Sequence, residues 1–250
     1  MTLLAISDII EQLLPYSSEI PERFVETTIE TLYMTLVTAV IAGALGIILG
    51  VTLTVTHKGN ILDNRYVYKI LENIINILRS IPFIIMLALI YPVTRAIVGT
   101  TIGTTAAIVP LVVATVPFYA KQVESALLEV DDGIVEAAEA MGTSPVGIIF
   151  SVYLKEGLPS LLRVSSVTIV SLIGTTTMAG AVGGGGLGDL AITRGYNRFQ
   201  HDVTLVSTLI IMAFVFISQG IGNYFVNKTS HKNKYCLLYT SDAADERSSV

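Results

Sequence analysis

Long apolar stretches separated by short polar ones set the pattern of this chain. Four stretches contain no Asp, Glu, Lys or Arg: 31–56, 96–120, 164–188 and 203–227. Each is long enough to cross the ~30 Å hydrocarbon layer of a membrane as a helix of about 20 residues. A fifth stretch is apolar from Ile81 onward and carries Glu72 and Arg79 toward its start. The pattern therefore predicts five transmembrane helices, at about 31–56, 70–92, 104–120, 158–180 and 203–227.

Composition agrees with a membrane protein. Hydrophobic residues make up 52% of the 250 residues, charged residues only 14%, and the mean hydropathy is +0.69. An average soluble domain carries about 25% charged residues. The sequence therefore predicts an all-α integral membrane protein, with residues 31–228 as its transmembrane domain.

Positive charges divide unevenly between the two sets of loops. Ten follow the first, third and fifth predicted spans: Lys58, Arg65, Lys69, Lys121, Lys155, Arg163, Lys228, Lys232, Lys234 and Arg247. Four lie in the remaining loops: Arg23, Arg95, Arg194 and Arg198. Since Lys and Arg are enriched in cytoplasmic loops, we expect the N-terminus outside and the C-terminus inside.

The two ends of the chain differ from the transmembrane domain. Residues 1–30 have several acids and one cation, but neither a basic start nor a small-residue cleavage pattern. We therefore expect an extracytoplasmic amphipathic segment and not a signal peptide. Residues 229–250 lose the apolar pattern, and we expect a tail that is disordered or foreign to the fold.

Few residues suit catalysis or metal binding. Cys236 is the only cysteine, and His57, His201 and His231 lie in separate polar regions, which predicts neither a metal cluster nor a catalytic triad. The pattern G-x-x-x-x-G-K-[ST] does not occur, so the sequence lacks a P-loop with which to bind ATP. We therefore expect a transport subunit and not an enzyme, with no metal, no cofactor and no nucleic-acid partner.

Charged residues within the spans bear on the energy source. No Asp or Glu lies between Glu72 and Glu124, or between Glu156 and Asp189, so carriers for a proton or sodium relay are missing there. Arg79 is the one candidate for a charge inside the membrane. Its side chain either extends to the inner surface or serves a transport pathway.

Two glycine patterns each have a packing interpretation and a functional one. Gly46 and Gly50 form a small-xxx-small pattern in the first span, which suits close packing within one subunit or a contact between two subunits. Residues 183–188 satisfy G-x-G-x-x-G, but no predicted strand precedes them. We therefore expect a flexible or tightly packed backbone at the outer mouth, and not a dinucleotide site.

The polar segment 121–157 lies on the predicted inner side and is expected to hold two short helices. Asp131 is a suitable N-cap for the first helix, and Gly142 can end it in a left-handed conformation. Ser144 followed by Pro145 is a suitable cap and first position for the second helix. The two helices are therefore expected to form an elbow at the inner membrane surface.

The first of these helices has an apolar face and an acidic one. Its apolar face is shallow and consists of Ile134, Ala137, Ala138 and Met141. The small residues would let the groove of a partner protein approach closely, while Glu136 and Glu139 pair with its cations. An ordinary surface helix lying on the bilayer is the alternative.

A family resemblance rests on the same segment. Glu136-Ala137-Ala138, followed after three residues by Gly142, resembles the EAA loop of binding-protein-dependent ABC importer permeases. That family pattern continues with I-x-L-P, and here Lys155 stands in place of the proline. Five other segments resemble methionine ABC importer permeases, so that the resemblance reaches about Lys228: residues 76–85, 98–103, 107–111, 124–129 and 180–188.

The resemblance implies a type I ABC importer permease fold in the bacterial cytoplasmic membrane, surrounded by membrane lipid. It implies a homodimer that binds a cytoplasmic ATPase dimer through Glu136, Ala137, Ala138 and Gly142 and receives methionine from an extracytoplasmic binding lipoprotein. Met178 corresponds to the family's gate in the pathway, although a packing role for this methionine stays open. Three alternatives remain: an importer for another amino acid or small organic solute, a secondary transporter, and a membrane scaffold.

Overall fold

The computed structural model describes the backbone of residues 15–245 and the side chains of residues 15–229. Over this part of the chain every regular element is a helix. Four are long and apolar enough to cross a membrane: α3 (Pro21–Thr56), α6 (Thr104–Leu127), α10 (Leu158–Ala179, continued by the π-helical η2, Gly180–Gly184) and α12 (His201–Asp245). A bent pair, α4 (Arg65–Ser80) and α5 (Phe83–Val98), passes the same test of length and composition only when its two helices are counted together, which gives up to five spans. The expected all-α membrane architecture is confirmed.

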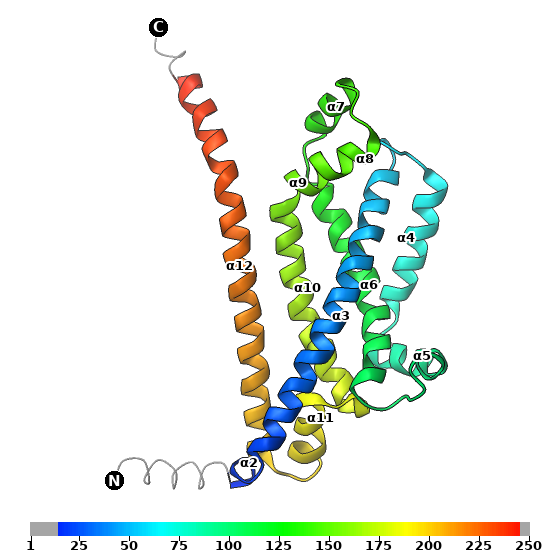
Figure 1. Ribbon diagram of the computed structural model, residues 1–250, viewed down its shortest axis with the longest axis vertical. Coiled ribbons are helices and arrows are strands. Elements are labelled where there is room, and N and C mark those ends of the chain that lie inside the picture. Colours follow the sequence, from blue (N-terminus) through cyan, green and yellow to red (C-terminus); the bar gives the residue numbers. More distant parts are fainter. Residues whose placement is uncertain (1–14, 246–250) are drawn as a thin grey trace.

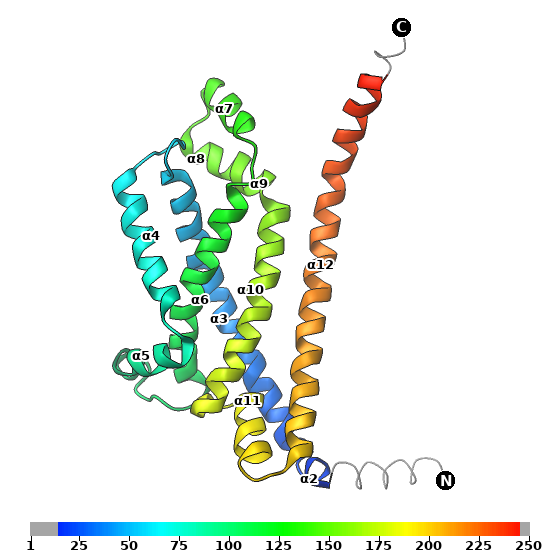
Figure 2. The same cartoon turned by 180° about the vertical axis from the view of Figure 1, so that it is seen from behind.

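The axes of the long helices are roughly aligned, so the bundle has two distinct ends (Figure 1). One end carries α7 (Asp132–Ala140), α8 (Pro145–Ile148), the π-helical η1 (Ile149–Tyr153) and α9 (Leu154–Glu156). The other end carries α2 (Pro15–Ser18), α5, α11 (Gly186–Leu190) and the π-helical η3 (Ala191–Tyr196). We call them the α7 end and the α11 end. Helix α12 diverges from the other helices toward the α7 end, in the front view and in the view from behind (Figure 1 and Figure 2).

The second span, expected at 70–92, is divided into two helices at Pro82. The chain bends by 110° between α4 and α5. Pro82 has no N–H to donate and disfavours a helical conformation in the residue before it, and Ile81 is accordingly extended, with φ −83° and ψ 120°. The two halves also extend past the predicted ends, because the Asn64 side chain caps α4 by accepting from two backbone N–H groups and Gly99 ends α5 in the left-handed conformation.

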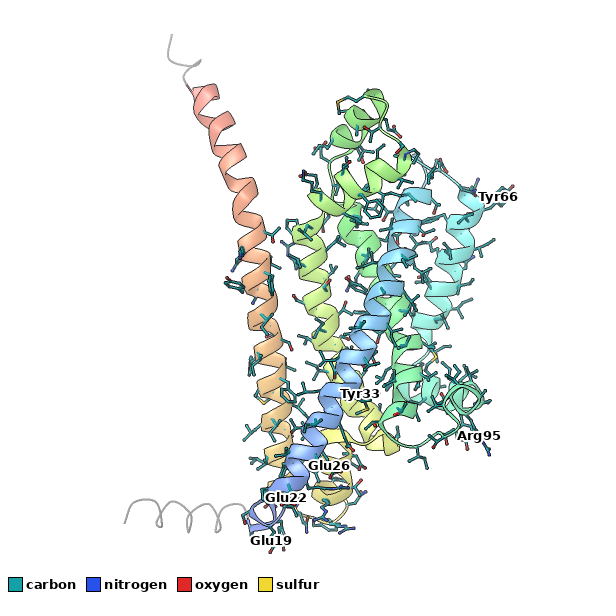
Figure 3. All side chains as sticks on the ribbon, in the orientation of Figure 1. Glu19, Glu22, Glu26, Tyr33, Tyr66 and Arg95 are labelled. Atoms are coloured by element: carbon teal, nitrogen blue, oxygen red, sulfur yellow. The ribbon has the colours of Figure 1, made fainter. Side chains whose placement is uncertain are left out.

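Helices also extend into the two end segments that the sequence sets apart from the transmembrane domain. Residues 21–30 belong to α3, whose 36 residues span about 54 Å, and the expectation for residues 1–14 lies outside the described part. Figure 3 places Glu19, Glu22 and Glu26 together near the start of this helix. At the other end α12 continues to Asp245, into the segment 229–250 that we expect to be a disordered or foreign tail. No Pro or Gly follows Gly222 to interrupt the helix.

Close packing of α3 on α6 holds the bundle together. A Cβ atom on Gly46 would lie 2.6 Å from Cδ1 of Tyr119, and one on Gly50 would lie 2.5 Å from Cβ of Val123. Real Cβ atoms do not approach other atoms so closely, so both glycines are required for this contact. Of the two interpretations of the small-xxx-small pattern, the structure supports packing within one subunit.

The glycine run at 183–188 is likewise packed against the first span. Gly183, Gly185 and Gly186 have φ values of 96°, 81° and 77°, which only glycine adopts readily. The turn they form is held by α3, because the N–H of Gly186 donates to Oε2 of Glu30 at 2.7 Å and the N–H of Leu187 donates to Oγ1 of Thr31 at 2.9 Å. The run is thus a tightly packed turn at the α11 end, and the described part of the chain contains no βαβ unit around it.

Candidate functional site

The first helix of the segment 121–157 has the two caps that the sequence predicts. Oδ1 of Asp131 accepts a hydrogen bond from the N–H of Gly133 at 2.8 Å. Gly142 has φ 77°, its N–H donates to the carbonyl of Glu139 at 2.8 Å, and the N–H of Thr143 donates to the carbonyl of Ala138 at 3.1 Å. This pair of bonds is a Schellman motif, which ends a helix through a left-handed residue. The predicted start and end of α7 are therefore confirmed.

The second half of the elbow is also confirmed. Oγ of Ser144 accepts from the N–H of Gly147 at 3.2 Å, and Pro145 is the first residue of α8. Lys155, which replaces the family's proline, lies within α9, and the chain turns into α10 at Gly157. A Cβ atom on Gly157 would lie 2.5 Å from the carbonyl oxygen of Tyr153, so the turn is closely packed.

The apolar residues of α7 are divided between a buried face and an exposed one. Val135 and Ala138 are buried in a cluster that includes Ile148, Val152 and Tyr153, and this cluster fixes α7 on the bundle. The predicted face is therefore wrong for Ala138, because the helix turns this residue inward against the bundle. Ile134, Ala137 and Met141 stay exposed, with 79% of Met141 accessible. We call these three residues the exposed face of α7.

Acidic residues of α7 border a hollow beside the exposed face. Glu136 and Glu139 line a cavity of about 320 Å³ between α7 and the loop 57–61, together with Asp132 and Lys58. Tyr153 joins this cavity to the bundle, since its hydroxyl donates to Oδ1 of Asn60 at 2.7 Å. Burial raises the pKa of the Tyr153 phenol, with Asp132 and Glu139 acting in the same direction and the Asn60 bond opposing them. The hydroxyl therefore remains protonated and able to donate.

A polar cluster joins α4 to α6 below this segment. Nζ of Lys121 lies 2.7 Å from Oε2 of Glu124 and 3.3 Å from Oε1 of Glu72. The hydroxyl of Tyr68 lies 3.0 Å from Oε1 of Glu124, whose side chain is almost fully buried. This cluster is not among the features predicted from the sequence. The sequence does contain a spacing that could have revealed it. Tyr68 and Glu72 are four residues apart and Lys121 and Glu124 are three apart, which places each pair on one helix face.

Three cavities follow one another along α6. At the α11 end, Ala107 and Pro110 of α6 line a cavity with Tyr91 of α5. In the middle, Ala114, Thr115 and Phe118 line a cavity of about 220 Å³. Toward the α7 end, Lys121, Gln122 and Ser125 line a third, of about 290 Å³.

Met178, the residue that corresponds to the family's gate, lies near this row of cavities. It is 45% exposed and follows Thr175, which lines the middle cavity, by three residues on α10. Residues three apart share a helix face, so Met178 lies beside the cavity without lining it. The structure thus keeps Met178 apart from the EAA residues, which lie at the α7 end.

Comparison with known proteins identifies the family. The profile described as "Binding-protein-dependent transport system inner membrane component" matches residues 44–231. A probable D-methionine transport system permease protein of Pasteurella multocida is 48% identical over 178 residues, which cover 71% of this chain and 82% of that protein. A methionine import system permease protein of Bacillus subtilis is 46% identical over 173 residues, 69% of this chain and 78% of that protein.

Solved structures agree with the sequence comparison. A chain of the MetNI methionine ABC transporter in an inward-facing conformation matches with a TM-score of 0.81 and 41% identity, covering 84% of this chain and 98% of that chain. An amino acid ABC transporter with histidines matches at a TM-score of 0.71 and 16% identity, which supports the fold alone. With the family profile and these relatives matched over most of its length, the chain belongs to the family of inner membrane components of binding-protein-dependent transport systems.

Proposed function

We propose that this chain is the permease subunit of an ATP-driven importer that carries methionine across the bacterial cytoplasmic membrane. The observation that carries the role of the subunit is the exposed face of α7, an apolar surface held rigidly at one end of the bundle. Methionine is supported by the names of the two relatives described above, a probable D-methionine transport permease and a methionine import permease.

In this proposal a cytoplasmic ATPase subunit binds the elbow through Glu136, Ala137 and Gly142, while Ala138, buried against the bundle, holds α7 in place. Ala137 presents little more than backbone, so a partner can approach closely, while the exposed Glu136 offers a charge to a cation. The buried contacts of Val135 and Ala138 connect α7 to the ends of α3, α6 and α10. A movement of the ATPase would thus reach the bundle through a packed contact and bias it between two states.

The remaining partners follow from the same assembly. The α7 end faces the cytoplasm and the α11 end faces outward, where a substrate-binding lipoprotein delivers methionine. A second copy of the chain completes the pathway, and Met178 lies beside it as a gate. ATP hydrolysis belongs to the ATPase subunits, since the sequence has no P-loop.

Reconstitution tests this function. The permease is inserted into proteoliposomes with its ATPase and binding protein, and ATP-driven uptake of radiolabelled methionine is compared with uptake of other amino acids. We expect methionine to be carried preferentially, and neither uptake nor ATP hydrolysis by the permease alone. Preferential uptake of another amino acid would replace methionine as the substrate. Uptake driven by an ion gradient without the ATPase would refute the importer mechanism.

A further inference from the structure

The middle cavity along α6 combines a position and a lining that suit a small charged molecule. It lies near the middle of α6, since Ala114 is about 15 Å and Phe118 about 14 Å from the nearer end of this helix at ~1.5 Å per residue. Its volume of about 220 Å³ is smaller than the ~300–1,000 Å³ of sites for drug-sized ligands. The break between α4 and α5 forms one side of it, through Leu78, Ile81 and Phe83.

Arg79 supplies a positive charge to this cavity. It lies in the last turn of α4, about 21 Å along the helix from Arg65 and thus farther from the α7 end than an arginine side chain reaches. An arginine at this depth costs about 2.5–3.5 kcal/mol or more unless it is paired or faces water. Among residues 15–229, no carboxylate lies within ion-pairing distance of it. Glu124, which lines the neighbouring cavity with Arg79, is paired with Lys121 instead.

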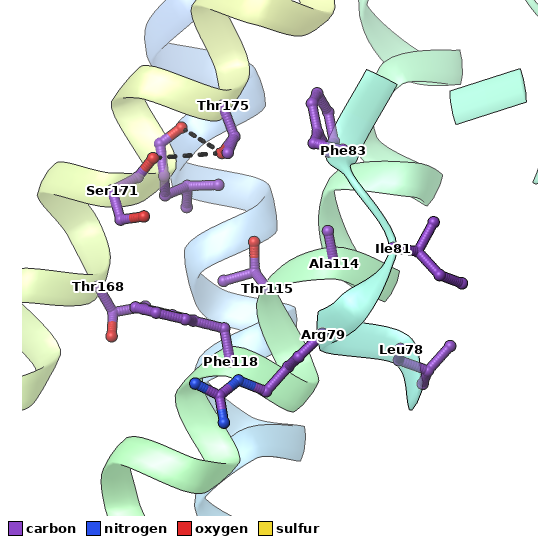
Figure 4. Close-up of a pocket in the computed structure, with 11 residues that line it drawn as sticks. Leu78, Arg79, Ile81, Phe83, Ala114, Thr115, Phe118, Thr168, Ser171 and Thr175 are labelled. Atoms are coloured by element: carbon purple, nitrogen blue, oxygen red, sulfur yellow. Dashed lines mark hydrogen bonds between the residues drawn. The ribbon is translucent and has the colours of Figure 1, made fainter. Parts of the chain in front are cut away.

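The opposite side of the cavity, formed by α10, supplies acceptors. Figure 4 shows Thr168, Ser171 and Thr175 on α10 across the cavity from Arg79. The hydroxyl of Thr168 donates its proton to the carbonyl of Val164 at 2.8 Å, and that of Thr175 donates within its own helix. Because these protons are committed to the backbone, the oxygen lone pairs are what the two side chains can offer a ligand. A guanidinium group, in contrast, can only donate.

The remaining lining is apolar and includes two aromatic rings. Phe83 of α5 and Phe118 of α6 supply the rings, and Leu172 lies between Ser171 and Thr175 in the sequence of α10. Aromatic rings make favourable contacts with thioether sulfur. The cavity therefore has a cation on one side, hydroxyl acceptors on the other, and an apolar surface between them.

We propose that this cavity is a substrate subsite at mid-membrane depth, in which Arg79 binds the α-carboxylate of a zwitterionic amino acid and the α10 hydroxyls accept from its ammonium group. The proposal rests on the importer function above and adds the residue that recognises the carboxylate. Arginine binds carboxylates through two parallel N–H bonds, which gives both strength and orientation. The α4–α5 break serves this role by ending α4 beside the cavity.

The test compares two ligands in two forms of the reconstituted complex. Methionine and methionine amide, which lacks the carboxylate charge, are offered to complexes carrying wild-type permease or Arg79→Gln. Uptake per ATP hydrolysed is measured, so that damage to the ATPase contact is separated from loss of substrate binding. The preference of the binding protein is the same for both permeases and cancels in the comparison.

Loss of a hydrogen bond to a charged group lowers methionine uptake per ATP by about ten- to hundred-fold in Arg79→Gln. Uptake of the amide stays unchanged, and Arg79→Lys recovers part of the methionine uptake because it keeps the charge. The matched control is Arg95→Gln. Arg95 is the exposed arginine in the last turn of α5, lies at the α11 end in Figure 3, and should transport as wild type.

Other outcomes overturn the subsite. One is methionine uptake at the wild-type rate by Arg79→Gln. Another is an equal loss of uptake for methionine and its amide in that variant. The third is a loss of uptake that parallels a loss of ATP hydrolysis in both Arg79 variants. If the wild-type complex does not carry the amide, the two Arg79 variants test the subsite through the ratio of methionine uptake to ATP hydrolysis. The subsite requires a low ratio in Arg79→Gln and a partly recovered ratio in Arg79→Lys. A wild-type complex that carries no methionine would refute the proposed function, which is a distinct result.

Discussion

The left-handed turn at Gly142 allows docking on α7 to be tested apart from folding. A Cβ atom at Gly142 meets no atom within 4 Å, so a side chain there causes no clash within the chain. What remains is the strain of a non-glycine residue at φ 77°, about 1–2 kcal/mol in general and less for Asp, which tolerates this conformation. Gly142→Asp should therefore leave the isolated permease folded.

The same substitution should weaken binding of the ATPase. If a partner's groove encloses the turn, the added carboxylate loses its water without gaining a partner. An unsatisfied polar group costs about 1–3 kcal/mol, and a charge costs more. Association should therefore weaken by about ten- to hundred-fold, with little ATPase recovered on copurification and little methionine uptake.

Gly99→Asp is the matched control for this experiment. Gly99 has φ 81°, meets no atom within 4 Å at its Cβ position, and ends α5 at the opposite end of the molecule. Both variants should show the same small decrease in melting temperature, whereas only Gly142→Asp should lose the ATPase. Full ATPase recovery and uptake by Gly142→Asp would refute the docking role of the turn.

Three further predictions concern orientation, packing and charge. A reporter enzyme fused after Asn60 should be cytoplasmic, and an external location would contradict the orientation derived from the Lys and Arg distribution. Gly50→Ala should lower the free energy of unfolding by about 1–3 kcal/mol through overpacking, measured as a lower melting temperature, while Gly43→Ala, with no atom within 4 Å, should not. Lys121→Met should destabilise the protein by up to about 3–5 kcal/mol, because the buried Glu124 carboxylate loses its cation and keeps only the hydrogen bond from Tyr68. The double variant with Glu124→Met should recover most of that loss, and equal melting temperatures for the single and double variants would contradict this account.

The sequence by itself determined the class of the protein and the local structure of the EAA segment. Hydrophobic length decides whether a helix can span a membrane, and this length is read directly along the chain. The caps at Asp131, Gly142 and Ser144 were predicted correctly because each depends on bonds within about five residues. Family membership followed from residues near the same turn, while the roles of Met178 and the EAA residues stay predictions.

Only the tertiary structure decided which residues meet across the fold. The break at Pro82 has a local cause, but its 110° angle comes from packing against α6 and α10. The burial of Ala138, the contact of Glu30 with Gly186 and the place of Arg79 opposite the α10 hydroxyls each join segments far apart in sequence. Such contacts depend on how whole helices pack, and no short pattern in the sequence specifies that packing.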